Sequence, residues 1–225
     1  MTAKKSFKQA LQNNYLSIIA EIKRRSPSKG NLAEIADPTL LAESYIKAGA
    51  NAISVLTNTP LFGGTLEDLE KVANHNKTMP ILRKDFITTK TQIDEAVKFG
   101  ANAVLLIVAN LGAQTKAFLD YSRSLNIDAL VEVHTQDELE LALTIDPDII
   151  GINNRNLKTL EVNTNQAFKL KKYIPKEIIT VAESGILNPE LAREYYQAGF
   201  DAVLIGEALV KSHSPAEFIR ACRHE

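Results

Sequence analysis

The sequence predicts an α/β protein of the (β/α)8 TIM-barrel class, with residues 1–225 forming a single domain. Its 225 residues are close to the roughly 250 that are typical of such barrels. A repeated pattern supports this fold, because Gly49, Gly100 and Gly199 each separate an amphipathic segment from a β-branched apolar run. Glycine is favoured just past a helix end, where the backbone turns left-handed. The 51 residues between the first two glycines fit two strand–helix units, and the 99 between the second and third fit about twice as many.

Eight short apolar runs are predicted to be the barrel strands. Such near-continuous apolar runs are typical of parallel strands that are buried on both faces. The expected strands are Ser17–Lys23, Ala52–Leu56, Ile81–Lys84, Ala103–Val108, Ala129–Val133, Ile149–Asn153, Ile178–Glu183 and Ala202–Ile205.

The segments that follow these runs have helical patterns. Asp37 and Asn188 stand directly before prolines, which is typical of an N-cap followed by proline at the first helical position. Alternating strands and helices of equal size, joined by right-handed crossovers, favour closure into a barrel. A short helical extension is expected before the first strand, at about residues 4–14. The expected helices are Pro38–Ala48, Thr65–Asn74, Thr89–Phe99, Ala113–Leu125, Gln136–Thr144, Thr164–Tyr173, Pro189–Ala198 and Pro215–Cys222.

Charged side chains stand at the carboxyl ends of five predicted strands. Alternate residues of a strand share a face, and TIM barrels carry their catalytic groups at this end. Mutual salt bridges are one interpretation, but the repeated placement favours an acid–base site, where neighbouring charges shift pKa values. His134 follows the fifth strand and is expected to be a solvated or capping residue. The candidates are Glu21, Lys23, Lys84, Glu132, Asn153, Arg155 and Glu183.

The last two predicted strands carry the pattern of an anion site. AESGI and LIGEAL each place a glycine, Gly185 or Gly206, just after a strand. Barrels often bind phosphate there through backbone N–H groups and a short helix N-terminus. Ser184 adds a hydroxyl, so the two loops together predict a phosphate site.

Two turn-rich loops are predicted to cover the mouth of the barrel. Arg24–Asn31 follows the strand that holds Glu21 and Lys23, and Leu56–Thr65 follows the second strand, with Phe62 as an aromatic wall. Mobile flaps over a site suit this position, with ordinary surface loops as the alternative.

Composition excludes several classes of function. A net charge of −1, from 26 basic and 27 acidic residues, gives no global field for nucleic acid or an anionic membrane. No apolar run reaches the roughly 18 residues of a membrane span, and the N-terminus lacks the pattern of a secretory signal. The single cysteine, Cys222, fits a reducing compartment, so we expect a cytoplasmic protein.

From Ser6 to about Ala221 the chain resembles the indole-3-glycerol phosphate synthases of tryptophan biosynthesis. The resemblance rests on blocks such as AEIKRRSPSKG, RKDFI, VEVH, INNRNL, VAESGI and VLIGEAL, of which the first, the second and INNRNL are highly specific. It implies conversion of 1-(o-carboxyphenylamino)-1-deoxyribulose 5-phosphate to indole-3-glycerol phosphate, carbon dioxide and water. It also implies that no metal and no organic cofactor take part.

The resemblance also implies roles for individual residues. Lys84 is the implied general acid that protonates the substrate ketone, and Glu132 the second acid–base group, which acts in dehydration. Lys23 is implied to pair with a substrate carboxylate or phosphate and to share in proton transfer. The other implied residues are Glu21 and Asn153 for orientation, Ser26, Phe62, Phe86, Arg155 and Glu183 in the pocket, and Ser184, Gly185, Gly206 and Glu207 at the phosphate.

The chain departs from the family pattern in two places. Only about sixteen residues precede the first strand, where members usually have a further N-terminal helix, and Glu207 stands where some members have a small hydroxyl residue. The expected partner is a small substrate with a carboxylate and a phosphate. We expect a monomer, and it stays open whether an isomerase docks weakly to it.

Two other functions remain as alternatives. A different phosphosugar barrel, such as phosphoribosylanthranilate isomerase or the tryptophan synthase α-subunit, would need fewer charges on the first, third, fifth and sixth strands. A non-catalytic phosphometabolite-binding subunit would have lost one proton-transfer residue, whereas Lys23, Lys84 and Glu132 are all present.

Overall fold

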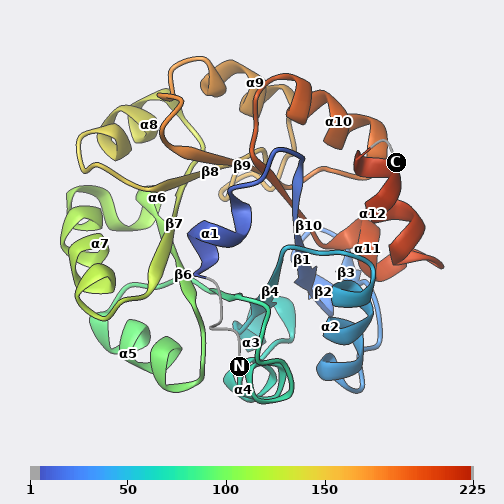
Figure 1. Cartoon of the computed structure of the whole chain (residues 1–225). Helices are drawn as coiled ribbons and strands as arrows, with labels where there is room; N and C mark the ends of the chain where they lie inside the picture. Colours follow the sequence, from blue (N-terminus) through green and yellow to red (C-terminus); the bar gives the residue numbers. More distant parts are fainter. Residues whose placement is uncertain (1–5, 224–225) are drawn as a thin grey trace.

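The computed structural model describes residues 6–223, which form a closed barrel of eight parallel strands inside a ring of helices (Figure 1). Around the barrel the strands follow the order β1-β10-β9-β8-β7-β6-β5-β4. The predicted fold class is confirmed, and no strand bound differs from its prediction by more than about one residue. The strands are β1 (Ser17–Ile22), β4 (Ala52–Leu56), β5 (Ile81–Lys84), β6 (Ala103–Ile107), β7 (Asp128–Val133), β8 (Ile149–Asn153), β9 (Ile179–Glu183) and β10 (Ala202–Ile205).

The eight predicted helices are all present. Several of them have a side-chain N-cap. Asn188, for example, directly precedes Pro189 at the start of its helix, and its side chain accepts a hydrogen bond from the Leu191 N–H. The helices are α2 (Pro38–Lys47), α4 (Leu66–His75), α5 (Lys90–Lys98), α7 (Thr115–Ser124), α8 (Gln136–Leu143), α9 (Asn165–Lys171), α10 (Pro189–Gln197) and α12 (Pro215–Arg223).

Six short elements were not predicted as separate elements. None has more than five residues, which leaves no room for a periodic pattern. Two of them form a two-stranded antiparallel ribbon inside the loop after β1. These elements are β2 (Arg25–Ser26) with β3 (Gly30–Asn31), α3 (Thr59–Phe62), α6 (Val108–Leu111), η1 (Gly112–Gln114) and α11 (Glu207–Lys211).

Two separate apolar clusters form the core. The larger one lies between the strands and the surrounding helices, and includes Tyr45 and Tyr195. The smaller one fills the barrel with inward-facing residues such as Ile19, Leu82 and Leu130. Because side chains alternate along a strand, the next inward positions toward the carboxyl end carry the charges. This alternation places the polar site directly on top of the inner apolar cluster.

Helix α1 (Phe7–Leu11) closes the opposite end of the barrel, and Figure 1 shows it at the centre of the ring. A capping box joins Ser6 and Gln9, and Phe7 and Leu11 are fully buried in the inner cluster. The Lys8 N–H donates to the carboxylate of Asp128, the first residue of β7, at 2.9 Å. The predicted extension at about 4–14 is therefore a helix at 7–11; its residues 4–5 lie outside the described part.

Within residues 6–223, no helix has both the length and the apolar character needed to cross a membrane.

Candidate active site

A cavity of about 670 Å³ opens at the carboxyl ends of the strands. Its floor is apolar, with Leu105, Ile107 and Leu204 from the inner cluster, and its walls carry the predicted polar groups. The structure brings together all the predicted site residues here, because each lies at the carboxyl end of a barrel strand or in the segment that follows it. They are Glu21, Lys23, Ser26, Phe62, Lys84, Phe86, Glu132, Asn153, Arg155, Glu183, Ser184, Gly185, Gly206 and Glu207.

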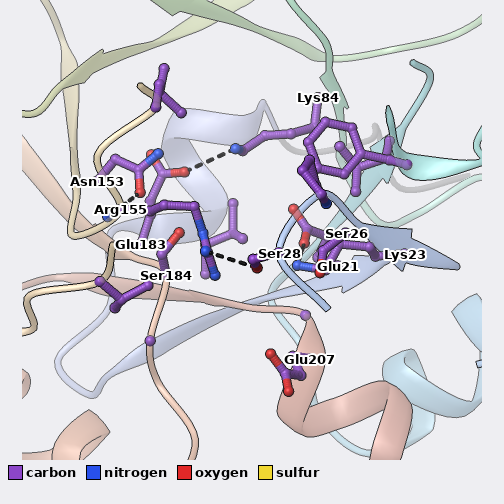
Figure 2. Close-up of a pocket in the computed structure, with 18 of the residues that line it drawn as sticks. Glu21, Lys23, Ser26, Ser28, Lys84, Asn153, Arg155, Glu183, Ser184 and Glu207 are labelled. Carbon is purple, nitrogen blue, oxygen red and sulfur yellow. Dashed lines mark hydrogen bonds and ion pairs between the residues drawn. The ribbon is translucent and has the colours of Figure 1, made fainter. Parts of the chain in front are cut away.

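Lys84, at the end of β5, lies between two carboxylates. Its Nζ is 3.4 Å from Glu132 Oε2 and 3.3 Å from Glu183 Oε2. Figure 2 shows the Lys84 side chain reaching across the cavity toward this group. Asn153 Nδ2 donates to the other oxygen of Glu132 at 3.1 Å, which fixes that carboxylate. Burial alone would lower the pKa of Lys84, but Glu183, Glu132 and Glu21 outweigh it and raise the pKa. Lys84 is therefore held as a protonated ammonium group.

Glu183, at the end of β9, is the least satisfied carboxylate of the cavity. Within the described chain neither of its oxygens accepts a hydrogen bond of ordinary geometry. Burial raises the pKa of Glu183 to about 8, Glu132 and Glu21 add to the rise, and Lys84 opposes it. The space for the side chain comes from Gly151 on β8, where a Cβ atom would lie 2.1 Å from Glu183 Oε1.

Glu21 and Lys23 form a second pair at the end of β1, with 2.8 Å between Glu21 Oε1 and Lys23 Nζ. Burial would raise the pKa of Glu21, but Lys23 and more distant cations outweigh it and lower the pKa. A glycine of the neighbouring strand end again makes the room, since a Cβ at Gly206 would lie 2.4 Å from Glu21 Oε1. Glu21 is therefore an ionised carboxylate that holds Lys23 in the cavity.

Arg155 reaches over the cavity from the loop after β8. Its backbone N–H donates to Asn153 Oδ1 at 2.9 Å, and its Nη1 donates to the Leu160 carbonyl at 2.8 Å. His134 does not line the cavity: its Nδ1 lies 2.6 Å from the Asn153 carbonyl, so it supports the β8 end from behind. This position agrees with the non-catalytic interpretation of His134.

The predicted anion site lies in the loops after β9 and β10. Ser184 and Gly185 have φ values of +64° and +79°, so two consecutive residues are left-handed. A Cβ at Gly185 would lie 2.6 Å from Val162 Cγ1, which requires glycine there. Gly206 leads into α11, and the Glu207 side chain is engaged by Lys29 and Lys211 at 2.7 and 2.9 Å.

Phe62 and Phe86 form the aromatic wall, with ring centroids 6.3 Å apart and an interplanar angle of 21°. Asp85, which the sequence analysis missed, holds this wall. Its Oδ1 accepts from the Phe86 N–H at 2.8 Å, and its Oδ2 accepts from Thr57 Oγ1 at 2.6 Å. The available signal was an acidic residue directly after a strand that ends in lysine.

Sequence reasoning also missed the apolar part of the wall. The apolar lining residues that were missed are Leu61, Leu157, Leu160, Val162, Ile186 and Leu187.

Among the described residues, no group of three or more His, Cys, Asp and Glu side chains is arranged to hold a metal ion.

Comparisons with known proteins agree with this geometry. A family model described as indole-3-glycerol phosphate synthase matches residues 1–222. The indole-3-glycerol phosphate synthase of Kineococcus radiotolerans is 47% identical over 214 residues, covering 93% of this chain and 78% of that protein. The one from Paenarthrobacter aurescens is 49% identical over 207 residues, covering 92% and 76%.

A solved structure supports the fold alone. Thiamine phosphate pyrophosphorylase from Pyrococcus furiosus aligns with a TM-score of 0.67 at 16% identity, covering 94% of this chain and 95% of that one. The family match over nearly the whole length, together with relatives near half identity, decides the assignment. The chain belongs to the indole-3-glycerol phosphate synthase family.

Proposed function

We propose that this chain converts 1-(o-carboxyphenylamino)-1-deoxyribulose 5-phosphate to indole-3-glycerol phosphate, carbon dioxide and water. The observation that carries the proposal is the position of Lys84, a protonated lysine held between Glu132 and Glu183 above an apolar floor. A protonated lysine at this place can donate a proton to a carbonyl oxygen of a bound substrate.

The cavity offers a separate contact for each part of the substrate. The phosphate is assigned to the N–H groups of the Ser184–Gly185 turn and of the Gly206–Glu207 loop. Lys23 and Arg155 are the cations available for the carboxylate. The anilino ring has the aromatic wall of Phe62 and Phe86.

Ser26 and Asn153 complete the binding contacts. Ser26 Oγ is buried and has no hydrogen-bond partner within residues 6–223, so a polar group of the substrate can satisfy it. Asn153, held by the Arg155 N–H, is placed to orient Glu132 and the anilino nitrogen.

Ring closure joins the ring carbon that bears the carboxylate to the ketone carbon. In this proposal Lys84 donates its proton to the ketone oxygen, which becomes a hydroxyl, and the carboxylate leaves as carbon dioxide. In dehydration, the hydroxyl takes up a proton and departs as water, and the carbon next to the nitrogen loses a proton, so that the indole double bond forms. Glu132 is the second acid–base group for these proton transfers, with Glu21 and Lys23 sharing in orientation and proton transfer. Electrons balance within the substrate, so no oxidant, reductant or organic cofactor enters the equation.

Indole fluorescence tests the proposal. Purified protein and the substrate should give indole-3-glycerol phosphate, and Lys84→Ala should lower kcat about a hundredfold or more, as expected for a general acid. Glu132→Gln serves as the companion variant and should slow dehydration. A wild-type protein that binds the substrate but never forms indole would instead be a non-catalytic binding subunit.

We further infer that the chain acts as a monomer in the cytoplasm. All the cavity residues come from one chain, and the single cysteine, Cys222, is buried and cannot form an internal disulfide. Light scattering on the active protein tests the first statement: a dimer at the concentrations used in the assay would contradict it.

A further inference from the structure

The loop after β1 is anchored at its base on one wall of the cavity. We call residues 24–31, which include the β2–β3 ribbon, the β1 flap. Arg24 donates to both carboxylate oxygens of Asp68, at 2.6 and 3.0 Å, and Arg25 donates to the Thr59 carbonyl at 2.7 Å. These contacts attach the base of the flap to α4 and α3. Motion of the flap is therefore expected at its tip.

The tip of the β1 flap reaches the opposite wall. Ser28 Oγ accepts a hydrogen bond from Arg155 Nη1 at 3.0 Å, which Figure 2 shows across the cavity. Lys29 Nζ lies 2.7 Å from Glu207 Oε1, at the start of α11. Both tip residues are exposed. Their two polar contacts join the tip of the flap to the loops that the proposed function assigns to anion binding.

Glu207 is a negative charge placed where a phosphate is expected. Burial would raise the pKa of Glu207, but hydrogen bonds from Lys211 and Lys29 outweigh it and lower the pKa, so the side chain is ionised. It follows Gly206 directly in the loop assigned to phosphate, and Figure 2 shows it at the beginning of α11, facing the cavity mouth. A bound phosphate would thus offer Lys29 a second anion in the same part of the site.

We propose that Glu207 is an internal anion that latches the β1 flap over the empty cavity, and that the substrate phosphate takes Lys29 from it on binding. The flap then stays closed in both states, with a different anion in each. Glu207 is in this view a positioning residue that acts through Lys29. The proposal rests on the phosphate position given under the proposed function.

Hydrogen–deuterium exchange of the flap amides tests the exchange of partners. The probes are indole-3-glycerol phosphate and its dephosphorylated form, indoleglycerol, on the intact enzyme. In Glu207→Gln without ligand, the flap amides should exchange about two- to fivefold faster than in wild type, because an exposed ion pair contributes little more than that. Saturating indole-3-glycerol phosphate should return exchange to the wild-type rate, and indoleglycerol should not.

Two further variants control this experiment. Lys29→Met should show fast flap exchange both with and without the phosphorylated product, because Lys29 serves both states. Lys211→Met removes a contact of Glu207 that does not involve the flap, and should keep the wild-type rate.

The outcomes separate the two proposals. If Glu207→Gln shows the wild-type rate without ligand, or stays fast with the phosphorylated product bound, the latch is wrong. If wild type binds the phosphorylated and dephosphorylated products with equal affinity, the phosphate assignment is wrong and the latch fails with it.

Discussion

The two ends of this barrel are built from the same strands but satisfy different demands. At the amino ends, α1 inserts Phe7 and Leu11 into the inner apolar cluster, and the polar contacts of Lys8 lie at the edge. At the carboxyl ends, inward positions of the strands carry lysine and carboxylate side chains that are buried with incomplete hydrogen bonding. The first end stabilises the fold, and the second holds groups whose burial costs stability.

The difference shows what satisfies a buried group at each end. Apolar side chains at the amino ends need only neighbours of matching shape. The Glu183 oxygens at the carboxyl ends lack ordinary hydrogen bonds within residues 6–223, and Ser26 Oγ lacks them too. A bound substrate can supply the missing hydrogen bonds. This accounts for buried polar atoms at the carboxyl end that have no partner when the cavity is empty.

The largest expected effect lies at the amino end. Phe7→Ala should lower the free energy of unfolding by about 3–5 kcal/mol, because it opens a cavity in the inner cluster. The kcat/KM of the folded enzyme should not change. Denaturant unfolding and activity at low temperature measure the two quantities. Leu40→Ala, at a side chain that is 63% exposed, is the control and should change stability by less than about 0.5 kcal/mol. A fall in kcat/KM for the folded Phe7 variant would show that the ends are coupled.

At the carboxyl end, Gly151→Ala tests the space made for Glu183. The added Cβ would lie 2.1 Å from Glu183 Oε1, so the carboxylate must leave its present position, in which Oε2 lies 3.3 Å from Lys84 Nζ. A displacement of this kind should lower kcat about ten- to a hundredfold, since small misplacements of reacting groups are costly. Steady-state kinetics, with a crystal structure of the variant, measure the effect. Unchanged kcat with a shifted Glu183 would show that the position of this carboxylate does not affect catalysis.

The sequence predicted the parts of this comparison that follow from periodicity. Alternation along the strands placed Glu21, Lys84 and Glu183 on inward positions at one end, and the structure confirms that placement. Resemblance supplied the chemical roles, which remain proposals. Asp85 was missed because it accepts hydrogen bonds from Thr57, in another loop, and from the N–H of Phe86, and no pattern within a strand indicates these contacts. The Lys29–Glu207 contact joins residues 178 positions apart, and nothing local in the sequence indicates it.

Glu183→Gln should separate stability from activity. Because burial raises the pKa of Glu183 to about 8, the folded state binds this proton more tightly than the unfolded state does. The favourable contribution of Glu183 to the free energy of unfolding is therefore fully present below the pKa that this side chain has in the unfolded chain. It is lost as the pH rises through the pKa that Glu183 has in the folded protein. Glu183→Gln should remove this decline and raise stability above pH 8 by about 0.5–2 kcal/mol, while activity falls.

Urea unfolding of wild type and Glu183→Gln at several pH values measures this effect. Glu177→Gln is the matched control, since that carboxylate lies on the exposed surface. The control should follow the wild-type pH curve. If the Glu183 variant is less stable than wild type across the whole range, its carboxylate stabilises the fold, and the contrast between the two ends is wrong at this position.

The smallest effect is expected for the charges at the amino end. Lys8 pairs with Asp148, and Arg123 Nη2 lies 3.0 Å from the same carboxylate, but all three side chains are more than one-third exposed. Lys8→Met should therefore cost less than about 1 kcal/mol, and the cost should shrink further in high salt. Thermal unfolding at low and high ionic strength measures it, with Lys116→Met, in an exposed pair on α7, as the matched control. A clearly larger loss, insensitive to salt, would mean that α1 is held by its charges as much as by Phe7 and Leu11. The two ends of the barrel would then both depend on lysine–carboxylate pairs, and would differ only in how much water reaches them.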